Sequence, residues 1–287
     1  MSVFSPIIFK GRGLHTGIDF TVKVTPFNDK QIIFVTPSGH VNVSPKNILP
    51  FDSHRGFSTV LKQNGVTVST VEHLLCALSQ FKYGAKIEIG HTNSKAADFK
   101  DKHFFEIPAI DGCAEIFYNS FLKAGWPAEI KFIDVLKGFT ITFKDSVATV
   151  IPNLKSKKIK YKVELEYENI YMGKLQHEFY PGLDSFVKEI ASARTFALEK
   201  DVSFLKQKGL ALGGTLDNAL VIGDNGILNK DGKRFDNEPA RHKMLDLIGD
   251  LSLLGGLPAA DIIVKRPGHA INAMIVMKIY KLSGKYI

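Results

Sequence analysis

The chain has 287 residues, of which 45% are hydrophobic and 23% charged, and its formal net charge is +8. This length predicts two domains of roughly 120–160 residues, with enough apolar residues for a sizeable core. The two cysteines exclude a disulfide framework, and no apolar run approaches the roughly 20 residues that span a bilayer. The first residues also lack the pattern of a secretory signal. We therefore expect a soluble, cytoplasmic protein.

The positive charge permits two interpretations. Scattered lysines could simply keep the protein in solution, or the chain could bind an anion such as a phosphate or a nucleotide. The densest lysine run, at 155–162, ends in an alternation with apolar residues that is typical of a half-exposed strand. It lacks the interleaved aromatic residues that single-stranded nucleic acid requires, so we expect no nucleic-acid partner.

The first half of the chain is predicted to form hairpins, a helix, a strand and a second helix. Residues 18–24 alternate between apolar and polar side chains, and residues 31–36 are predicted to be the returning strand of the same hairpin. Asn64–Gly65 is a strong turn signal between two further strands. A strand, a helix and a domain boundary are then predicted at 85–89, 114–124 and 125–127.

Residues 69–81 predict an amphipathic helix that begins with acid–base groups. Ser69 can cap this helix, and Glu72 three residues later would complete a capping box, which is a purely structural explanation for the glutamate. Glu72 and His73 would also place a carboxylate and an imidazole side by side at an exposed helix end. A functional site is easily built at such a position.

The second half repeats this order loosely, so we predict a second α+β domain packed against the first. The predicted strands are 130–136, 139–143, 148–151, 159–167, 219–222 and 262–265, and the predicted helices are 184–191 and 202–208. The last segment, 271–280, fits either a strand or a helix.

The segment 237–254 predicts a single helix, which Gly255 and the residues after it would end. His242, Asp246 and Asp250 follow one another at intervals of four, so they line up along one side of that helix. A solvated polar face would explain this stripe. A histidine and a carboxylate one turn apart can also bind a single cation.

Catalytic zinc commonly takes three His, Asp or Glu ligands and leaves one position for water. His242 and Asp246 would supply two ligands. His73 is the best third candidate, because the adjacent Glu72 could take a proton from the water. These groups would come from two domains, which places the site in the cleft between them.

Four further residues have both a chemical and an ordinary structural interpretation. His269 could be a mobile catalytic imidazole held protonated by Asp250, or a surface histidine in an exposed loop. Thr195 could stabilise an oxyanion, or cap a helix end. Lys243 could bind a phosphate, or be a solvated lysine. His15 is better explained as a structural residue.

Seven short motifs occur in a fixed order along the chain. They are GRGLHTG at 11–17, STVEHLLCAL at 69–78, EIPAIDGCA at 106–114, SARTF at 192–196, GLALGGTLDNALV at 209–221, NEPARHKMLDLIGDL at 237–251 and GHAIN at 268–272. Together they resemble the UDP-3-O-acyl-N-acetylglucosamine deacetylase family, the zinc amidases of lipid A biosynthesis. Seven motifs in this order are highly specific, whereas none of them would be alone.

The resemblance implies a fold and a reaction. The fold would comprise two domains of similar topology, at 1–125 and 126–287, each a β-sheet layered on α-helices, with the active site at their interface. The second domain would carry a βαβ insert at about 193–223. The reaction would be the zinc-dependent hydrolysis of the N-acetyl group of UDP-3-O-acyl-N-acetylglucosamine, a small-molecule substrate.

The resemblance also implies the role of each site residue. One zinc ion would be held by His73, His242 and Asp246. The catalytic groups would be Glu72 as general base, His269 as a protonated histidine with Asp250 beside it, and Thr195 at the oxyanion. The substrate would be bound by Lys243 at its diphosphate and by Phe196, Gly214 and Thr215 along a passage for the acyl chain.

The chain departs from the family pattern in three places. The stretch before Gly11 is a poor match. Residues 92–105 look longer than the usual connection, and Pro267 stands where serine is common, which would stiffen the loop before His269. The alternative function is a non-catalytic protein that binds acylated nucleotide sugars on the same fold. We expect a monomer that contacts a membrane surface transiently, because a single acyl chain gives only modest membrane affinity.

Overall fold

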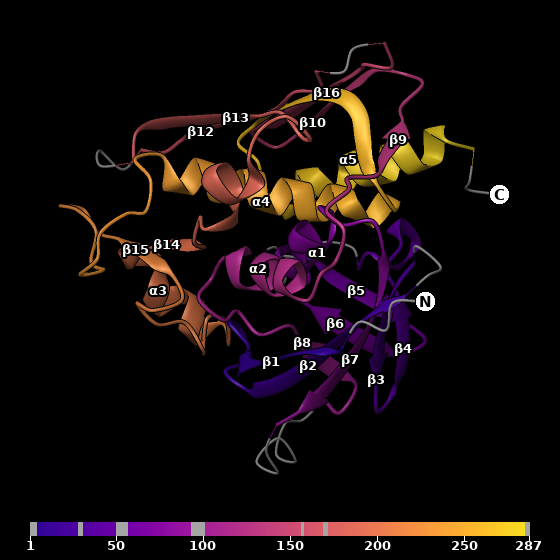
Figure 1. Ribbon diagram of the computed structural model, residues 1–287. Coiled ribbons are helices and arrows are strands. Elements are labelled where there is room, and N and C mark those ends of the chain that lie inside the picture. Colours follow the sequence, from indigo (N-terminus) through magenta and orange to yellow (C-terminus); the bar gives the residue numbers. More distant parts are fainter. Residues whose placement is uncertain are drawn as a thin grey trace.

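The computed structural model describes residues 5–27, 31–49, 57–92, 101–155, 158–168 and 172–284. Its helices lie between its sheets (Figure 1). The sheet of the second half lies at the top of the view, above α4 (Glu238–Leu251) and α5 (His269–Leu282). Below them lie α1 (Glu72–Leu78), α2 (Glu115–Lys123) and the sheets of the first half. The predicted α+β fold class is confirmed.

The five-stranded sheet of the first half has the order β1-β2-β7-β3-β4. These strands are β1 (Ile7–Arg12), β2 (Asp19–Phe27), β7 (Gly84–His91), β3 (Ile32–Thr36) and β4 (Gly39–Asn42). The predicted hairpin between 18–24 and 31–36 is wrong, because β7 lies between β2 and β3 and pairs with both. Turn residues favoured a local pairing, but β7 buries Ile87 and Ile89 at the centre of the sheet.

A smaller sheet in the first half contains β5 (Val60–Gln63), β6 (Val66–Ser69) and β8 (Phe104–Glu106). The predicted hairpin at Asn64–Gly65 is confirmed, and both residues have the positive φ that this turn requires, 50° and 85°. Of the long segment 92–105, residues 93–100 lie outside the described part of the chain.

The helix α1 corrects two predictions. All seven of its residues are buried, so it is not amphipathic, and its start is not exposed. Ser69 belongs to β6, and the helix begins after Val71 without a side-chain cap. The capping box is therefore wrong, because the preceding strand continues through Ser69 and leaves the Glu72 side chain free for other contacts. The predicted helix at 114–124 is confirmed by α2.

The sheet of the second half has the order β10-β11-β16-β12-β13, and β9 pairs with one end of β16. Its strands are β9 (Phe132–Asp134), β10 (Phe139–Phe143), β11 (Ser146–Pro152), β12 (Tyr161–Glu166), β13 (Lys174–Phe179) and β16 (Leu257–Lys265). The strand β13 was not predicted, because the polar side chains of KLQHEF hide its alternation.

Two connections of the second half bear on the site. The predicted helix at 184–191 is a short π-helix, Val187–Ala191, and the chain after it runs through the SARTF motif. A small unit follows, in which β14 (Phe196–Leu198) and β15 (Leu220–Ile222) pair in parallel and α3 (Glu199–Gln207) connects them. In Figure 1 this unit projects to the side of the layered body.

Candidate metal centre and active site

Three side chains from two helices converge where α1 crosses α4. The Nε2 atoms of His73 and His242 lie 3.7 Å and 3.3 Å from Oδ1 of Asp246. All three residues are buried, with 4%, 2% and 1% of their surface exposed. This Oδ1 has no hydrogen-bond partner. A buried carboxylate oxygen without a donor, facing two imidazole nitrogens, fits a bound cation and suits the His and Asp ligands that zinc accepts.

A second set of donors, Glu72, Asp246 and His269, is equally compact. It suits a cation less well, because one oxygen of each carboxylate already accepts a hydrogen bond. Oε2 of Glu72 accepts a hydrogen bond from a backbone N–H, and Oδ2 of Asp246 accepts one from Lys243 at 2.7 Å. We therefore place the candidate metal site at the two histidines and Oδ1 of Asp246.

The close approach of α1 and α4 depends on a glycine. A Cβ atom at Gly249 would lie 2.2 Å from the carbonyl oxygen of Glu72, a distance that real Cβ atoms do not reach. Gly249 lies between Asp246 and Asp250 on α4. The absence of a side chain there lets the first turn of α1 pack against α4, which brings Glu72 and His73 to both carboxylates.

The tautomer of His242 is set by a backbone contact. Its Nδ1 lies 3.0 Å from the carbonyl oxygen of Ala193, so Nδ1–H donates and Nε2 keeps its lone pair toward Asp246. Burial lowers the pKa of His242 to about 3, so the ring is neutral. Burial alone would raise the pKa of Asp246, but the positive charges of Lys243 and His269 hold it well below its usual range. Both groups are thus in the state that binds a metal.

Glu72 and His269 form the acid–base part of the site. Oε1 of Glu72 lies 3.6 Å from Nε2 of His269, and Nδ1 of His269 lies 3.0 Å from Oδ2 of Asp250. Burial raises the pKa of Glu72 to about 7. Burial would lower the pKa of His269, but Asp250, Glu72 and Asp246 together raise it to about 9. A proton acceptor and a charged imidazole therefore face one another beside the metal ligands.

The position of His269 corrects the sequence analysis. It is the first residue of α5 and is only 4% exposed, whereas we expected an exposed loop. The loop prediction followed from Pro267 and Gly268, but the helix begins directly after them and buries its first side chain against α4. The three-residue stripe on α4 is likewise buried, so the solvated-face alternative is wrong.

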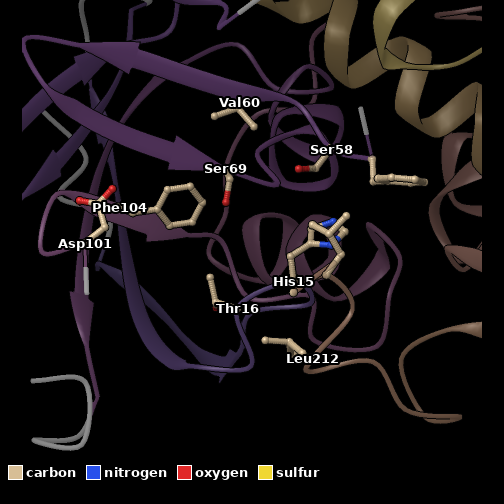
Figure 2. Close-up of a pocket in the computed structure, with 11 residues that line it drawn as sticks. His15, Thr16, Ser58, Val60, Ser69, Asp101, Phe104 and Leu212 are labelled. Atoms are coloured by element: carbon tan, nitrogen blue, oxygen red, sulfur yellow. The ribbon is translucent and has the colours of Figure 1, made fainter. Parts of the chain in front are cut away.

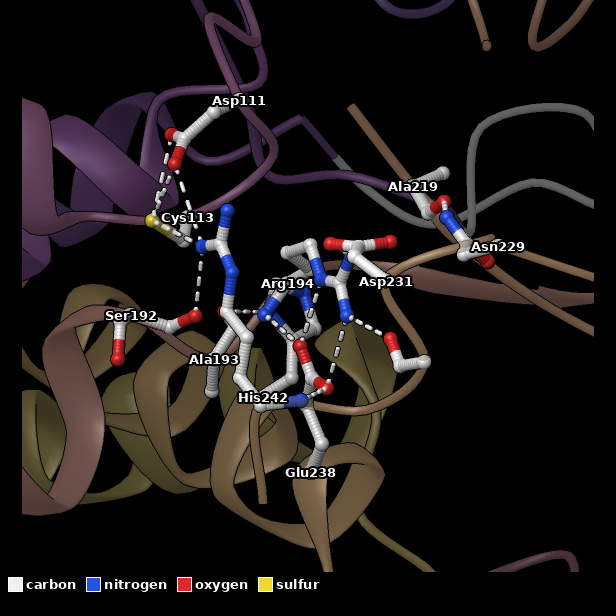
Figure 3. Close-up of polar contacts among 12 residues, drawn as sticks. Asp111, Cys113, Ser192, Ala193, Arg194, Ala219, Asn229, Asp231, Glu238 and His242 are labelled. Carbon is white, nitrogen blue, oxygen red and sulfur yellow. Dashed lines mark hydrogen bonds and ion pairs between the residues drawn. The ribbon is translucent and has the colours of Figure 1, made fainter. Parts of the chain in front are cut away.

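A buried ion-pair network holds the segment that carries Ala193 (Figure 3). The Arg194 guanidinium donates to Glu238, with Nε 2.9 Å from Oε1 and Nη2 3.2 Å from Oε2. Its other bonds go to Asp231 at 3.0 Å and to the carbonyl of Gly232 at 2.6 Å. Arg194 is 1% exposed and Glu238 is fully buried. This network holds the segment that carries Ala193 next to the His242 ring.

Arg234 links this network to the first half of the chain. Its backbone N–H donates to Glu238, and Nη1 donates to Asp111 at 3.2 Å and to the carbonyl of Ser192 at 2.9 Å. Asp111 belongs to the first half of the chain and Glu238 to the second, and Figure 3 shows both residues. The interface beside the metal ligands is therefore held by charge as well as by apolar packing.

A cavity of about 420 Å³ opens beside the site and runs under the β14–α3–β15 unit. Thr195, Phe196, Gly214 and Thr215 all line it, together with apolar residues of α3 such as Val202. The Thr195 backbone N–H donates to the carbonyl of Gly112 at 2.8 Å. These four residues are thus brought together, next to the metal ligands.

Lys243 lies between the metal ligands and this cavity. Its Nζ is 2.7 Å from Oδ2 of Asp246 and 5.5 Å from the centre of the Phe196 ring, and its side chain is 19% exposed. The solvated-lysine alternative is therefore wrong. Lys243 presents a positive charge at the mouth of the site, where an anionic group could reach it.

His15 lines a second cavity, which has a volume of about 330 Å³ (Figure 2). Glu106, which is fully buried, accepts hydrogen bonds from the backbone of His15 at 2.8 Å and of Thr16 at 2.9 Å. This carboxylate shapes the GRGLHTG turn and explains the motif structurally. The Nε2 atom of His15 is buried without a partner, and the ring also borders the larger cavity.

Four polar residues of this region were not predicted as parts of the site. They are Thr59, Glu106, Arg194 and Glu238. Arg194 and Glu238 belong to motifs that we quoted. Their opposite charges are the one sequence feature that could have suggested a buried pair between them. Thr59 gave no signal, because a threonine in an alternating strand is ordinary.

Two histidines and a carboxylate beside a buried glutamate are typical of metal-dependent hydrolases. A family model for UDP-3-O-acyl N-acetylglycosamine deacetylase matches residues 2–281, and the chain therefore belongs to this family. Three similar relatives are named UDP-3-O-acyl-N-acetylglucosamine deacetylase. The Syntrophotalea carbinolica protein is 34% identical over 278 residues, covering 96% of this chain and 85% of the relative.

The other two relatives are similar to the chain to the same degree. The Alcanivorax borkumensis protein is 35% identical, over 96% of this chain and 88% of its own length. The Campylobacter fetus protein is 36% identical, over 91% and 85%. Among the described residues, no helix is long and apolar enough to cross a membrane.

Proposed function

We propose that this protein removes the N-acetyl group of UDP-3-O-acyl-N-acetylglucosamine, giving acetate and the free amine, in lipid A biosynthesis. The observation that carries the proposal is the meeting of His73, His242 and Asp246 within reach of Glu72 and His269. Family membership supplies the substrate class. We further propose that the resident metal is a single Zn²⁺, held by the two histidines and Asp246.

Each catalytic residue has a role that follows from its surroundings. A bound zinc ion supplies Lewis-acid polarisation and lowers the pKa of water. Glu72 accepts the proton of the attacking water as the bond from oxygen to the acetyl carbon forms. His269, oriented by Asp250, donates a proton to the leaving nitrogen as the carbon–nitrogen bond breaks. Thr195 and the positive charge of His269 stabilise the oxyanion that develops in between.

The substrate would be bound on either side of the reacting group. Lys243 would meet the diphosphate, since its ammonium lies at the mouth of the site. The acyl chain would lie in the 420 Å³ cavity, against Phe196, Gly214 and Thr215, because that lining is largely apolar. We propose domains at 1–125 and 126–287, with the β14–α3–β15 unit as the insert of the second. We also propose a cytoplasmic monomer that contacts the membrane surface transiently.

The test is an acetate-release assay with metal analysis on the same preparation. The wild-type protein should bind about one zinc per chain and release acetate, and Glu72→Gln should keep the metal and lose at least a hundredfold in kcat, on the order expected for a general base. Glu129→Gln, at an exposed ion pair with Lys82, is the control and should retain full activity. Substrate binding without acetate release by the wild-type protein would contradict the proposal.

A further inference from the structure

Thr59 is buried at the point where the catalytic groups of the two halves meet. It is 3% exposed and immediately precedes β5, so it belongs to the first half of the chain. Neither the sequence pattern nor the reaction described above gives it a role. Its contacts nevertheless include both the proposed proton acceptor and the group that orients the proposed proton donor.

The backbone of Thr59 binds one side of the catalytic pair. Its N–H donates to Oε2 of Glu72 at 3.0 Å. This bond occupies one oxygen of the carboxylate and leaves Oε1 facing Nε2 of His269 at 3.6 Å. Because the donor is a main-chain N–H, this bond is retained whatever side chain stands at position 59.

The hydroxyl of Thr59 binds the other side. Oγ1 donates to Oδ1 of Asp250 and lies 3.1 Å from Nδ1 of His269. The second oxygen of Asp250 receives Nδ1–H of His269 at 3.0 Å and the side-chain amide of Asn272 at 2.9 Å. Both oxygens of Asp250 are therefore engaged, and its orientation is fixed by three donors.

This arrangement leaves one atom of each catalytic group available. The proton on Nδ1 of His269 is committed to Asp250, so its Nε2 points toward Glu72 and toward Oδ2 of Asp246, 3.8 Å away. Glu72 comes from α1, whereas Asp250 and His269 come from α4 and α5. Thr59 contacts Glu72 of the first half through its backbone and Asp250 of the second half through its side chain.

We propose that Thr59 is a positioning residue that sets the distance between Glu72 and His269. It holds Glu72 directly through its backbone N–H. It holds His269 indirectly, because its hydroxyl binds Asp250, which orients His269. The proposal rests on the function proposed above. A group that must accept a proton and a group that must donate one need a defined separation, and a misplacement of about 1 Å in such a site can cost about a hundredfold in rate.

Three substitutions separate this role from simple packing. Thr59→Val keeps the shape and the backbone N–H but removes the hydroxyl, and Thr59→Ser keeps the hydroxyl but removes a methyl group. Thr36→Val is the matched control, since Thr36 is also buried and its hydroxyl donates to a backbone carbonyl within the β3–β4 turn. Each variant loses either the hydroxyl or the methyl group, never both.

The first measurement is kcat and KM for acetate release, with the bound zinc of each preparation. We expect Thr59→Val to lose about tenfold to a hundredfold in kcat, the range for one hydrogen bond to a charged group, with KM and metal content unchanged. Thr59→Ser and Thr36→Val should remain within about threefold of the wild type. Unchanged kcat in Thr59→Val, or an equal loss in Thr59→Ser, would overturn the proposal.

A second measurement does not depend on turnover. The hydrogen-bonded Nδ1–H of His269 should give a slowly exchanging, downfield imidazole resonance in the proton NMR spectrum, assigned by its absence in His269→Gln. We expect this resonance in the wild type and in Thr59→Ser, and we expect fast exchange to remove it in Thr59→Val. Its persistence in Thr59→Val would reject the positioning role, even if the wild-type protein released no acetate. Thr59→Ala replaces the valine variant if the latter does not fold.

Discussion

Two buried charged clusters lie along α4, and they differ in whether their hydrogen bonds are complete. The arginine cluster consists of the buried pair Arg194 and Glu238 with the exposed Asp231, and the histidine cluster consists of His73, His242 and Asp246. In the arginine cluster, each oxygen of Glu238 accepts two hydrogen bonds, from Arg194 and from the backbone of residues 194 and 234. In the histidine cluster, Oδ1 of Asp246 and Nδ1 of His73 have no partner.

The difference teaches what each cluster is for. A buried ion pair whose hydrogen bonds are all satisfied needs nothing further and holds the chain in place. A buried carboxylate oxygen that lacks a donor and faces imidazole lone pairs is expensive, because burial of an unpaired polar group costs about 1–3 kcal/mol. That cost is removed when a cation binds. We therefore interpret the arginine cluster as a structural element of the fold, and the histidine cluster as the proposed metal site.

The largest expected effect comes from breaking the histidine cluster. His73→Gln should lose the bound zinc and reduce kcat/KM by at least a thousandfold, on the scale of removing a principal stabiliser of the transition state. The folding free energy of the zinc-free protein should change by only about 1 kcal/mol, because Nδ1 of His73 makes no hydrogen bond to lose.

Zinc titration completes this test. Zinc at a hundredfold excess over Kd should stabilise the wild-type protein by about 2.7 kcal/mol and should leave His73→Gln unaffected. Chemical denaturation with and without zinc measures both values. An unchanged zinc content in His73→Gln would show that the metal is held elsewhere.

Breaking the arginine cluster should lower the free energy of unfolding and leave the zinc content unchanged. Glu238→Gln leaves the buried guanidinium of Arg194 with only the exposed Asp231 as a countercharge, and the loss of a buried partner of this kind costs about 3–5 kcal/mol of folding free energy. Its zinc content should remain at one per chain. Glu129→Gln removes a charge from an exposed pair with Lys82 and should cost at most about 1 kcal/mol. A loss below 1 kcal/mol in Glu238→Gln would remove the distinction between the clusters.

The contact between α1 and α4 should tolerate no side chain at Gly249. Gly249→Ala places a Cβ against the Glu72 carbonyl, and overpacking of this kind typically costs about 1–3 kcal/mol. The better helix propensity of alanine returns up to about 1 kcal/mol, so a net loss of up to about 2 kcal/mol is expected. The displaced His73 should also weaken zinc binding.

A strand glycine provides the control for this substitution. Gly90 in β7 has open space at its Cβ position, so Gly90→Ala should leave zinc binding unchanged. Equal zinc affinities in the two variants would show that the histidine cluster does not depend on the close approach of the helices.

The sequence predicted the local elements well and their partners poorly. Period and turn chemistry located β10, α2, α4 and the Asn64–Gly65 hairpin, because these depend on neighbouring residues. The pairing of β3 with β7 depends on a strand some fifty residues away, which no local pattern contains.

The site shows the same division. Spacing on α4 suggested His242 and Asp246, the start of the helix at 69–81 suggested Glu72 and His73, and the seven ordered motifs supported these roles and that of His269. The packing that makes these residues a site was not visible, since burial depends on the layers above and below. The contacts of Thr59 and the pairing of Arg194 with Glu238 join segments 191 and 44 residues apart. Such contacts are properties of the folded chain.

The smallest expected effect concerns a buried histidine that belongs to neither cluster. His177 on β13 is 7% exposed, its Nε2 has no hydrogen bond, and its nearest carboxylate, Glu189, is 3.9 Å away. Burial, together with the charge of Arg241, lowers the pKa of His177 to about 4. In the unfolded chain His177 has an ordinary pKa near 6.5, so between pH 4 and pH 6.5 it is protonated there but neutral in the folded protein.

The pH dependence of stability follows from this difference. The contribution of His177 is fully present above pH 6.5 and is lost as the pH falls toward 4, because the unfolded state then binds more protons. Between pH 7 and pH 4.5 the wild type should lose on the order of 1 kcal/mol more than His177→Gln. Urea denaturation of both proteins, with zinc removed so that the histidine cluster contributes equally, measures the difference. Parallel pH profiles would show that the burial of His177 does not lower the stability of this fold at acid pH. The burial of unpaired groups in the histidine cluster would then not be a sufficient reason to expect a cation there.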